Sequence, residues 1–386
     1  MNGEDMANKT LANAKNAKND EFYTQYHDIE KEMNAYLEYD KNIFRNKTIL
    51  LPCDDPEWSN FTKYFAQNFE NFGLKKLIST SYAANSKKYK TNYQPTLFEV
   101  NDPQFDTYKT NLNGKIFILT KDKNKNGKID IEDLEWHYLD GDGDFRSAEI
   151  GKLRDEADVI ITNPPFSMFR EFLNWIIESS KQFVIIGNMN AITYKEVFPL
   201  IQENKMWLGY GFDAGNAYFS SPFANVYGEG VYNSETNLVK FRNVCWFTNI
   251  DHGKRHQHLP LMTAEDNYKF SKHKEIKGKK YFKYDNYDAI EVPYTDAIPS
   301  NYRGVMGVPI SFLQKYSPDQ FSIVGLSRYT KTQGMSKEFV DAYYKSGQTG
   351  TICEGHPDLC YYDENNYPVV PYMRVLIKFN INEVIK

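Results

Sequence analysis

Four adjacent residues, Asn163-Pro164-Pro165-Phe166, have the types needed to hold and polarise a planar amine. They follow the apolar run 158–162, which predicts a strand, and precede a helical pattern over 167–179. The two prolines remove two backbone donors, which leaves the Asn163 side-chain oxygen and the Pro164 carbonyl as acceptors. Together they can accept both hydrogens of an exocyclic NH2 group, while Phe166 stacks on a planar base. Ligands of open α/β sheets bind at the carboxyl ends of strands, which favours a catalytic turn over a chance turn.

The elements that position this turn alternate between strand and helix over residues 20–210. Strands are predicted at 47–52, 74–80, 114–120, 158–162 and 182–188, and helices at 21–37, 56–73, 146–157, 167–179 and 193–204. The alternation predicts an α/β fold with a doubly wound sheet. Residues 1–19 are rich in Asn, Lys and Ala and are expected to be mobile. The 211–386 region is loop-rich and is expected to hold late strands of the sheet, including one strand over 238–250.

Composition narrows the class of protein. The 386 residues are enough for a large core, and 41% hydrophobic and 25% charged residues are close to the globular average. No apolar run has transmembrane length, and the first twenty residues have no secretory core. Four cysteines in this length do not make a disulfide framework. We therefore expect a reduced, cytoplasmic protein without membrane contact.

The acidic stretch over 121–148 contains a second candidate site. In an EF-hand-like loop, positions 1, 3, 5, 7, 9 and 12 supply the oxygen ligands of calcium. Here they are Asp122, Asn124, Asn126, Lys128, Asp130 and Asp133. Asp133 replaces the usual bidentate Glu, and the segment before the loop looks like a strand, while 131–139 could form an exiting helix. Two interpretations stay open for the 121–140 insertion: a structural calcium or other hard-cation site, and a solvated acidic loop.

Several longer strings resemble one known family. "KNDEFYTQYHDIEKE", "CDDPEWSNFTKYF", "GLKKLIST", "GDGDFRS", "DVIITNPPFSMFREF", "NVCWFTNIDH" and "GVMGVPISFL" are similar to the EcoRI-type adenine-specific DNA methyltransferases. The resemblance spans roughly residues 10–325. It implies a Rossmann-like sheet, S-adenosylmethionine as methyl donor, and transfer to N6 of an adenine flipped out of double-stranded DNA. It also implies a restriction–modification setting with a cognate endonuclease, a monomer, and no metal in the chemistry.

The resemblance also assigns residues. Asn163, Pro164, Pro165 and Phe166 would hold and stack the adenine, with Asn163 also lining the cofactor site. The cofactor would be contacted by Tyr23, Thr24, Cys53, Asp54, Asp55, Pro56, Ser79, Thr80, Asp144 and Phe145. Among these, Asp144 and Phe145 would meet the cofactor's adenine and Tyr23 and Thr24 its methionine end. The loop after the first strand lacks the usual glycines, and the second strand ends without the usual acidic residue for the ribose.

A basic span over 252–284 stands out in a chain of net charge −5. If the protein binds DNA, as the resemblance implies, this span is expected to contact the DNA phosphates. The alternative is a solvated lysine-rich loop. The DNA-contact candidates are Lys254, Arg255, Lys272, Lys274, Lys277, Lys279 and Lys280. The Gly- and aromatic-rich loop 209–232 fits either a DNA groove or ordinary packing. In the methyltransferase frame, 211–386 would be the target-recognition region.

Two rival functions remain at this point. The same tetrapeptide can serve the methylation of an RNA base or of a protein glutamine amide. A protein of another class, which binds DNA without catalysis or interacts with partners through calcium, is the second rival. It would transfer no methyl group to any substrate.

Overall fold

The computed structural model describes residues 22–55, 59–83, 102–212, 216–221, 227–228 and 230–380. Pro56 and the predicted mobile segment 1–19 lie outside this range. The described part divides into two units, Met1–Ala191 with Met206–His252 (unit 1) and Ile192–Lys205 with Gly253–Lys386 (unit 2). Each unit is described by itself.

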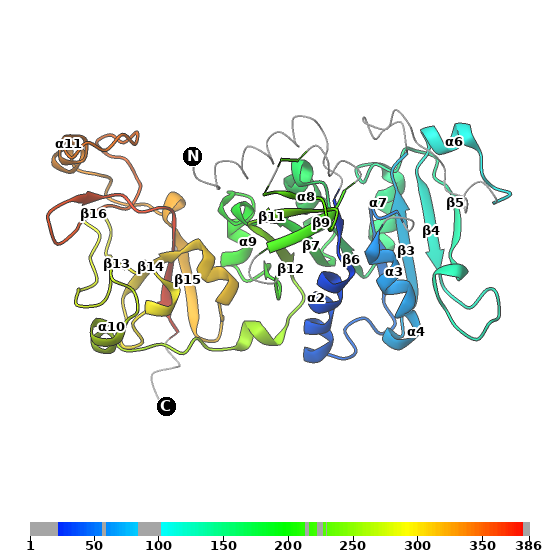
Figure 1. Cartoon of the computed structure of the whole chain (residues 1–386), viewed down its shortest axis with the longest axis horizontal. Coiled ribbons are helices and arrows are strands. Elements are labelled where there is room, and N and C mark those ends of the chain that lie inside the picture. The colour runs from blue at the N-terminus through cyan, green and yellow to red at the C-terminus, as the bar shows by residue number, and fades with distance from the viewer. Residues whose placement is uncertain are drawn as a thin grey trace. The chain divides into compact units, whose positions relative to one another are not determined.

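Unit 1 is built on an eight-stranded mixed sheet with the order β5-β4-β3-β2-β6-β7-β12-β8 (Figure 1). Its four central strands are parallel, and the outer strands on both sides are antiparallel. The strands are β2 (Thr48–Leu51), β3 (Lys76–Ser81), β4 (Lys115–Leu119), β5 (Glu135–Tyr138), β6 (Val159–Thr162), β7 (Gln182–Asn188), β8 (Trp207–Leu208) and β12 (Val244–Thr248). The five strands predicted from apolar runs are all present, and the mixed α/β class is confirmed.

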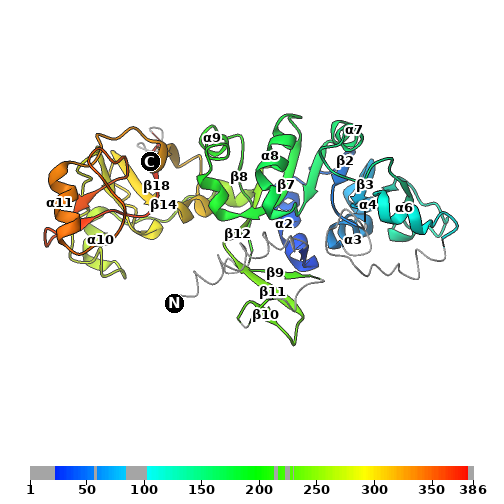
Figure 2. The same ribbon diagram turned by 90° about the horizontal axis from the view of Figure 1, so that it is seen from above.

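Helices cover both faces of this sheet. Figure 2 shows α7 (Ala148–Glu156) and α8 (Phe169–Ile177) on one face, with α2 (Tyr26–Tyr39) and α3 (Asn60–Gln67) on the other. The caps explain where the helices begin and end. Ser59 and Ser147 each accept a backbone N–H of the first turn, and Gly73 ends α4 (Phe69–Phe72) in the left-handed conformation that favours glycine.

Alternate positions of the central strands face α2 and α3. Ile49, Leu51, Val159 and Ile161 are fully buried and share one core with Ile29, Met33, Tyr36, Phe61 and Phe65 from the two helices. Because side chains alternate across a strand, the intervening residues face α7 and α8. Burial of both faces is why these strands read as continuous apolar runs in the sequence.

A small second sheet in unit 1 has the order β1-β9-β11-β10. Its strands are β1 (Tyr23–Thr24), β9 (Asn216–Ser220), β10 (Tyr232–Asn233) and β11 (Leu238–Arg242). The single strand predicted over 238–250 is therefore wrong, because β11 and β12 lie in different sheets. Asn243 stands between them with a φ of 59°, a conformation that turns the chain out of one sheet and into the other.

Two other predicted elements differ from the structure. The segment 131–139 forms a 3-10 turn (Ile131–Asp133) followed by β5, so an exiting helix is absent there. Trp136 points inward beside Phe117 of β4, which gives the strand alternation that the helical interpretation ignored. The helix predicted over 193–204 is only α9 (Phe198–Gln202), with Pro199 in its first turn.

Unit 2 has its own four-stranded sheet in the order β13-β14-β18-β15, and a hairpin of β16 and β17. The strands are β13 (Ala289–Glu291), β14 (Val305–Pro309), β15 (Phe321–Leu326), β16 (Tyr361–Tyr362), β17 (Pro368–Val369) and β18 (Arg374–Phe379). The helices α10 (Ala264–Phe270) and α11 (Lys337–Lys345) flank long loops. In neither unit does a described helix combine the length and the apolar character that a membrane crossing needs.

Candidate active site

The candidate site lies where the order of the parallel strands reverses. From β2 the chain continues to β3 on one side, whereas β6 and β7 lie on the other side. In open α/β sheets a ligand crevice forms at this point, outside the carboxyl ends of the strands. The Pro52–Asp55 loop leaves β2 here, and Asn163 leaves β6. The structure thus brings together two predicted sites that are more than one hundred residues apart in the chain.

The Asn163 amide is held in one orientation by the backbone. Its Nδ2 donates a hydrogen bond of 2.7 Å to the carbonyl of Phe22. Its Oδ1 is buried and has no hydrogen-bond partner among the described residues. A buried acceptor without a donor is costly, and such groups in native structures are often functional. The amide is therefore oriented with a free acceptor at the end of β6.

Phe166 begins the short 3-10 turn Phe166–Met168 and lies among aromatic rings of unit 1. Its ring stacks on Phe22 with centroids 5.8 Å apart, and it meets Phe219 and Phe241 of the small sheet edge-on. Sequence reasoning missed Phe22, which contributes both the carbonyl for Asn163 and this ring. Only its place in the string "DEFYTQ" could have pointed to it.

Asp54 is buried at the end of the β2 loop, and its carboxyl group bonds to protein side chains. Ser59 Oγ lies 2.8 Å from its Oδ1, and Thr162 Oγ1 lies 2.5 Å from its Oδ2. Burial raises the pKa of Asp54 to about 7, against the lowering effect of the Thr162 and Ser59 hydrogen bonds. Both oxygens of this predicted cofactor ligand are thus engaged within the protein.

Ser79 and Thr80, the predicted cofactor residues near the end of β3, also bond inside this cluster. Ser79 Oγ hydrogen-bonds to the carbonyl of Asp54 and lies 3.0 Å from Thr62 Oγ1. Thr80 Oγ1 accepts the backbone N–H of Cys53 at 3.3 Å. The structure therefore brings Cys53, Asp54, Ser79 and Thr80 together at the carboxyl ends of β2 and β3. Thr62 of α3 joins the same cluster.

Cys53 has a φ of 68° in the loop where the usual glycines are missing. This is the left-handed region, which glycine enters at little cost and other residues enter at about 1 kcal/mol or more. The loop keeps a glycine-like backbone without glycine. The loop therefore differs from the common methyltransferase pattern in its residue types and keeps a backbone conformation that is typical of glycine.

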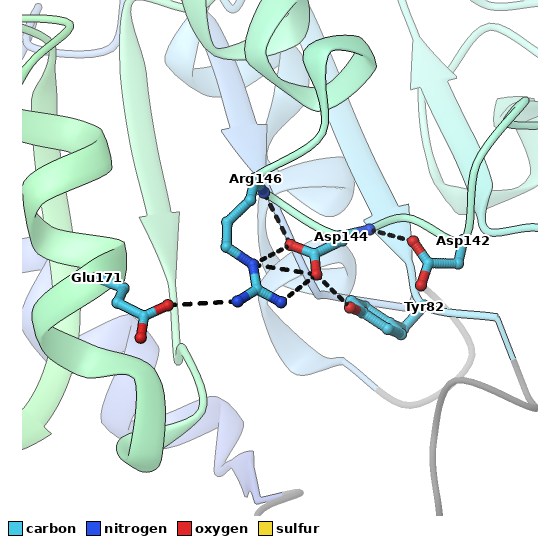
Figure 3. A network of polar contacts seen from close by, with 5 residues as sticks. All are labelled: Tyr82, Asp142, Asp144, Arg146 and Glu171. Carbon is cyan, nitrogen blue, oxygen red and sulfur yellow. Dashed lines mark hydrogen bonds and ion pairs between the residues drawn. The ribbon is translucent and has the colours of Figure 1, made fainter.

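Asp144 lies at the centre of a polar network that Figure 3 shows. Its carboxylate accepts hydrogen bonds from the Arg146 guanidinium at 2.5–3.2 Å and from the Tyr82 hydroxyl at 2.9 Å. The Arg146 hydrogen bonds are the main reason that the pKa of Asp144 is held below its usual value. Arg146 also reaches Glu171 of α8 at 3.4 Å. An amino group that binds to Asp144 has to share this carboxylate with Tyr82 and Arg146. The sequence analysis predicted neither of these two partners.

Three further predicted cofactor residues, Phe145, Tyr23 and Thr24, also lie in unit 1. Phe145 is 2% exposed and packs edge-on against Phe172 and Trp175 of α8. Tyr23 and Thr24 form β1, and the Thr24 hydroxyl is buried without a hydrogen-bond partner among the described residues. Thr24 Oγ1 and Asn163 Oδ1 are thus two buried polar atoms of unit 1 without a hydrogen-bond partner among the described residues.

The acidic loop does not gather as a metal site in the described part of the chain. No group of three or more His, Cys, Asp or Glu side chains there is arranged to hold a metal ion. The loop's oxygens instead accept its own backbone N–H groups: Asp133 accepts from Lys123, Asn124 and Asp130, and Asp122 accepts from Asn126 and Gly127. Asn124 and Asn126 accept from Asn126 and Lys128, and Asp130 from Glu132. The structure gives no support to calcium, because the side-chain oxygens of the loop accept hydrogen bonds from the loop's own backbone.

Six of the seven predicted DNA-contact residues, all in unit 2, fall into two groups. Arg255 is 6% exposed and hydrogen-bonds to Asn204, while Lys272 and Lys279 form ion pairs with Asp296 and Glu364. Lys274, Lys277 and Lys280 are exposed and form no ion pair with a described residue. The last three therefore have free ammonium groups, whereas Arg255 is directed into the protein. Lys254 is half-buried.

Comparisons with known proteins agree with this geometry. A family described as adenine-specific methyltransferase EcoRI matches residues 10–380. Type II methyltransferase M.EcoRI from Escherichia coli is 43% identical over 320 residues, which cover 82% of this chain and 89% of the relative. Type II methyltransferases M.MpnI from Mycoplasma pneumoniae and M.MgeORF184P from Mycoplasma genitalium are 31% and 34% identical. These matches cover 81% of this chain and 83% and 84% of the relatives.

No solved structure matches the chain. The family match covers nearly the whole chain, including the turn at Asn163 and the loop at Asp54, and it confirms the resemblance seen in the sequence. The chain belongs to the EcoRI family of adenine-specific methyltransferases.

Proposed function

We propose that this methyltransferase transfers a methyl group from S-adenosylmethionine to N6 of an adenine in double-stranded DNA. One observation carries the assignment to an amine: the buried Asn163 Oδ1 without a partner, held at the carboxyl end of β6 by the Nδ2 bond to Phe22. Asn163 Oδ1 and the Pro164 carbonyl accept the two N6 hydrogens, which draws the nitrogen towards tetrahedral geometry and frees its lone pair. Phe166 supplies the ring beside the base.

S-adenosylmethionine supplies an electrophilic methyl group when it is bound. The residues present fit this cofactor, because Thr24 Oγ1 is an unpartnered buried donor in β1 and Asp144 is an ionised acceptor after β5. The cofactor would be held in a Rossmann-like sheet by Tyr23 and Thr24, the Cys53–Pro56 loop, Ser79 and Thr80, and Asp144 and Phe145. Asp54, Ser79 and Thr80 contribute by shaping the loop, since Ser79 and Thr80 bond to the backbone of Asp54 and Cys53 and the Asp54 carboxyl group bonds to Thr162. Catalysis is then mostly orientation and hydrogen-bond polarisation.

An adenine inside a duplex is out of reach of such a turn. The base has to leave the stack, at a cost of a few kcal/mol. Contacts to DNA phosphates offset this cost, and we assign them to unit 2 within the 211–386 target-recognition region. A functional partner would be an endonuclease of the same specificity. We expect the methyltransferase itself to act as a cytoplasmic monomer.

Three of the predicted DNA-contact lysines, those with free ammonium groups, provide the test of the DNA surface. Replacing Lys274, Lys277 and Lys280 together by alanine is expected to weaken binding to duplex DNA of any sequence. Each lost phosphate contact should reduce the slope of log K against log salt by about 0.9. Binding by fluorescence anisotropy at several salt concentrations measures this slope.

The ion-paired lysines provide the matched control. Replacing Lys272 and Lys279 by alanine should change the slope less, because these lysines already form ion pairs with Asp296 and Glu364. An unchanged slope in the triple variant would show that this surface does not contact DNA, whereas an equal loss in both variants would show that the ion-paired lysines contact DNA as well.

The substrate class is tested by direct competition. Methyl transfer from labelled S-adenosylmethionine is measured with duplex DNA, RNA and protein in parallel, and N6-methyladenine is mapped by long-read sequencing. We expect label in duplex DNA at one sequence. Label confined to RNA or protein would favour the other amino-methyltransferase function, and absence of label in all three would favour a non-catalytic protein.

A further inference from the structure

A buried carboxyl group ties the two loops of the candidate site together. Asp54 is 5% exposed, and its side chain joins the end of β2 to Thr162, the last residue of β6. Thr162 immediately precedes Asn163. Any change in the contact between Asp54 and Thr162 is therefore passed directly to the turn that holds the amine.

The hydrogens in this contact can be counted. Thr162 Oγ1 lies 2.7 Å from the carbonyl oxygen of Pro52 and 2.5 Å from Asp54 Oδ2. A hydroxyl has one hydrogen, which cannot lie along both contacts. A carbonyl oxygen has none, so an ionised Asp54 would leave one of the two short oxygen–oxygen contacts without a hydrogen. A proton on Asp54 Oδ2 satisfies both: Asp54 donates to Thr162, and Thr162 donates to Pro52.

The other carboxyl oxygen fits the same count. Ser59 Oγ donates to Asp54 Oδ1 at 2.8 Å and itself accepts the backbone N–H of Phe61 at 3.1 Å. Oδ1 is thus an acceptor and Oδ2 the donor. The chain of hydrogen bonds runs in one direction, from Ser59 through Asp54 and Thr162 to Pro52.

We propose that Asp54 is a neutral carboxylic acid in the working enzyme and acts as a positioning residue that fixes Asn163 through Thr162. This extends the proposed function, because it rests on the assignment of Asn163 to the amine. The surroundings favour the neutral form: the group is buried, and the charge that faces it is Asp55, which is also acidic. Loss of the proton breaks the chain at Thr162.

The sign of the pH dependence follows from the pKa of Asp54. It is about 7 in the folded protein and 3.8 for an ordinary Asp, so the folded state holds the proton more tightly. The stability that this provides is fully present below the unfolded value and is lost as the pH rises through about 7. Replacement by asparagine keeps a donor towards Thr162 and an acceptor for Ser59, and it cannot ionise.

Infrared spectroscopy tests the protonation state without using activity. At about pH 5.5, where exposed carboxyl groups are mostly ionised, the full-length protein should show a neutral carboxyl band that Asp54→Asn lacks. The control Asp155→Asn, which removes an exposed carboxylate from α7, should keep the band. Absence of a difference between wild type and Asp54→Asn would overturn the proposal, and would leave the assignment of Asn163 untouched.

Melting and kinetics test the consequences. Relative to wild type, Asp54→Asn should gain about 5 °C in Tm between about pH 5.5 and pH 8.5, while Asp155→Asn should gain nothing. Thr162→Val removes the relay and should lower kcat by about 10- to 100-fold with a smaller change in the KM for S-adenosylmethionine. Thr162→Ser keeps the hydroxyl group and should therefore have a kcat close to that of wild type.

Three results would contradict the positioning role. These are a Tm gap between wild type and Asp54→Asn that does not change with pH, a kcat in Thr162→Val equal to that of wild type, and no recovery in Thr162→Ser. If Thr162→Val does not fold, Thr162→Ser and Asp54→Asn still decide, since each retains the donors and acceptors of the chain.

Discussion

Replacing Asn163 by alanine is expected to lower kcat by about 100- to 1000-fold, which corresponds to about 2.7–4 kcal/mol of transition-state stabilisation. The variant loses the buried Oδ1 acceptor that polarises the amine, and it also loses the 2.7 Å bond to Phe22. Single-turnover methyl transfer to duplex DNA measures the chemical step apart from product release. The expected signature is a loss in kcat at nearly unchanged affinity for the cofactor.

Two controls separate catalysis from folding. Asn174 lies exposed on α8 in the same unit, so Asn174→Ala should transfer methyl at the wild-type rate. Asn163→Asp keeps an oxygen in the Oδ1 position but places a second acceptor against the Phe22 carbonyl, and it should also be impaired. A fully active Asn163→Ala variant with a normal Tm would remove Asn163 from the mechanism.

The largest effect on stability is expected at Glu32, which is fully buried in α2. Its carboxylate accepts the Tyr36 hydroxyl at 2.5 Å and the backbone N–H groups of Tyr210 and Gly211 at 2.8 and 2.9 Å. Glu32→Ala leaves these three donors without this acceptor, and the Tyr36 hydroxyl among them is fully buried. We expect the free energy of unfolding to fall by about 3–5 kcal/mol, as measured by denaturant titration.

A glutamate of the same helix provides the comparison. Glu38 is exposed near the end of α2, so Glu38→Ala should change the free energy of unfolding by less than about 0.5 kcal/mol. The neighbouring backbone gives a second check, because a Cβ at Gly209 would overlap Glu32 Oε1 and lie 2.8 Å from Trp246 Cβ. Gly209→Ala should therefore destabilise unit 1 as well. Equal stabilities of the Glu32 and Glu38 variants would show that this carboxylate does not anchor the loop.

The central strands could be read from the sequence because they are buried on both faces. Such strands consist of short apolar runs, and β2, β3, β6 and β7 were all predicted near their observed bounds. The edge strand β5 was harder, because only Trp136 of its four residues is buried. The break at Asn243 was missed for another reason: a single residue in the left-handed region leaves no trace in hydrophobic periodicity.

The charged residues of unit 2 show why the sequence alone cannot tell which lysines of a basic span are free to bind a ligand. Lys272 and Lys279 pair with Asp296 and Glu364, which lie 24 and 85 residues further along the chain. Arg255 is buried against Asn204. Pairing and burial depend on where distant segments meet, so only the fold separates the free cations from the occupied ones.

The sequence by itself pointed to the family and predicted the chemistry of the amine site, because Asn163-Pro164-Pro165-Phe166 is contiguous and its strand and helix are local patterns. It also led to the prediction that Asp54, Ser79 and Asp144 lie near the cofactor. Only the tertiary structure decided how these groups act. Hydrogen bonds between residues far apart in the chain tie Asp54 to Thr162, Ser79 to Thr62, and Tyr82 to Asp144. A hydrogen bond needs two groups within about 3 Å, and for these pairs only the packing of the strand ends brings them that close.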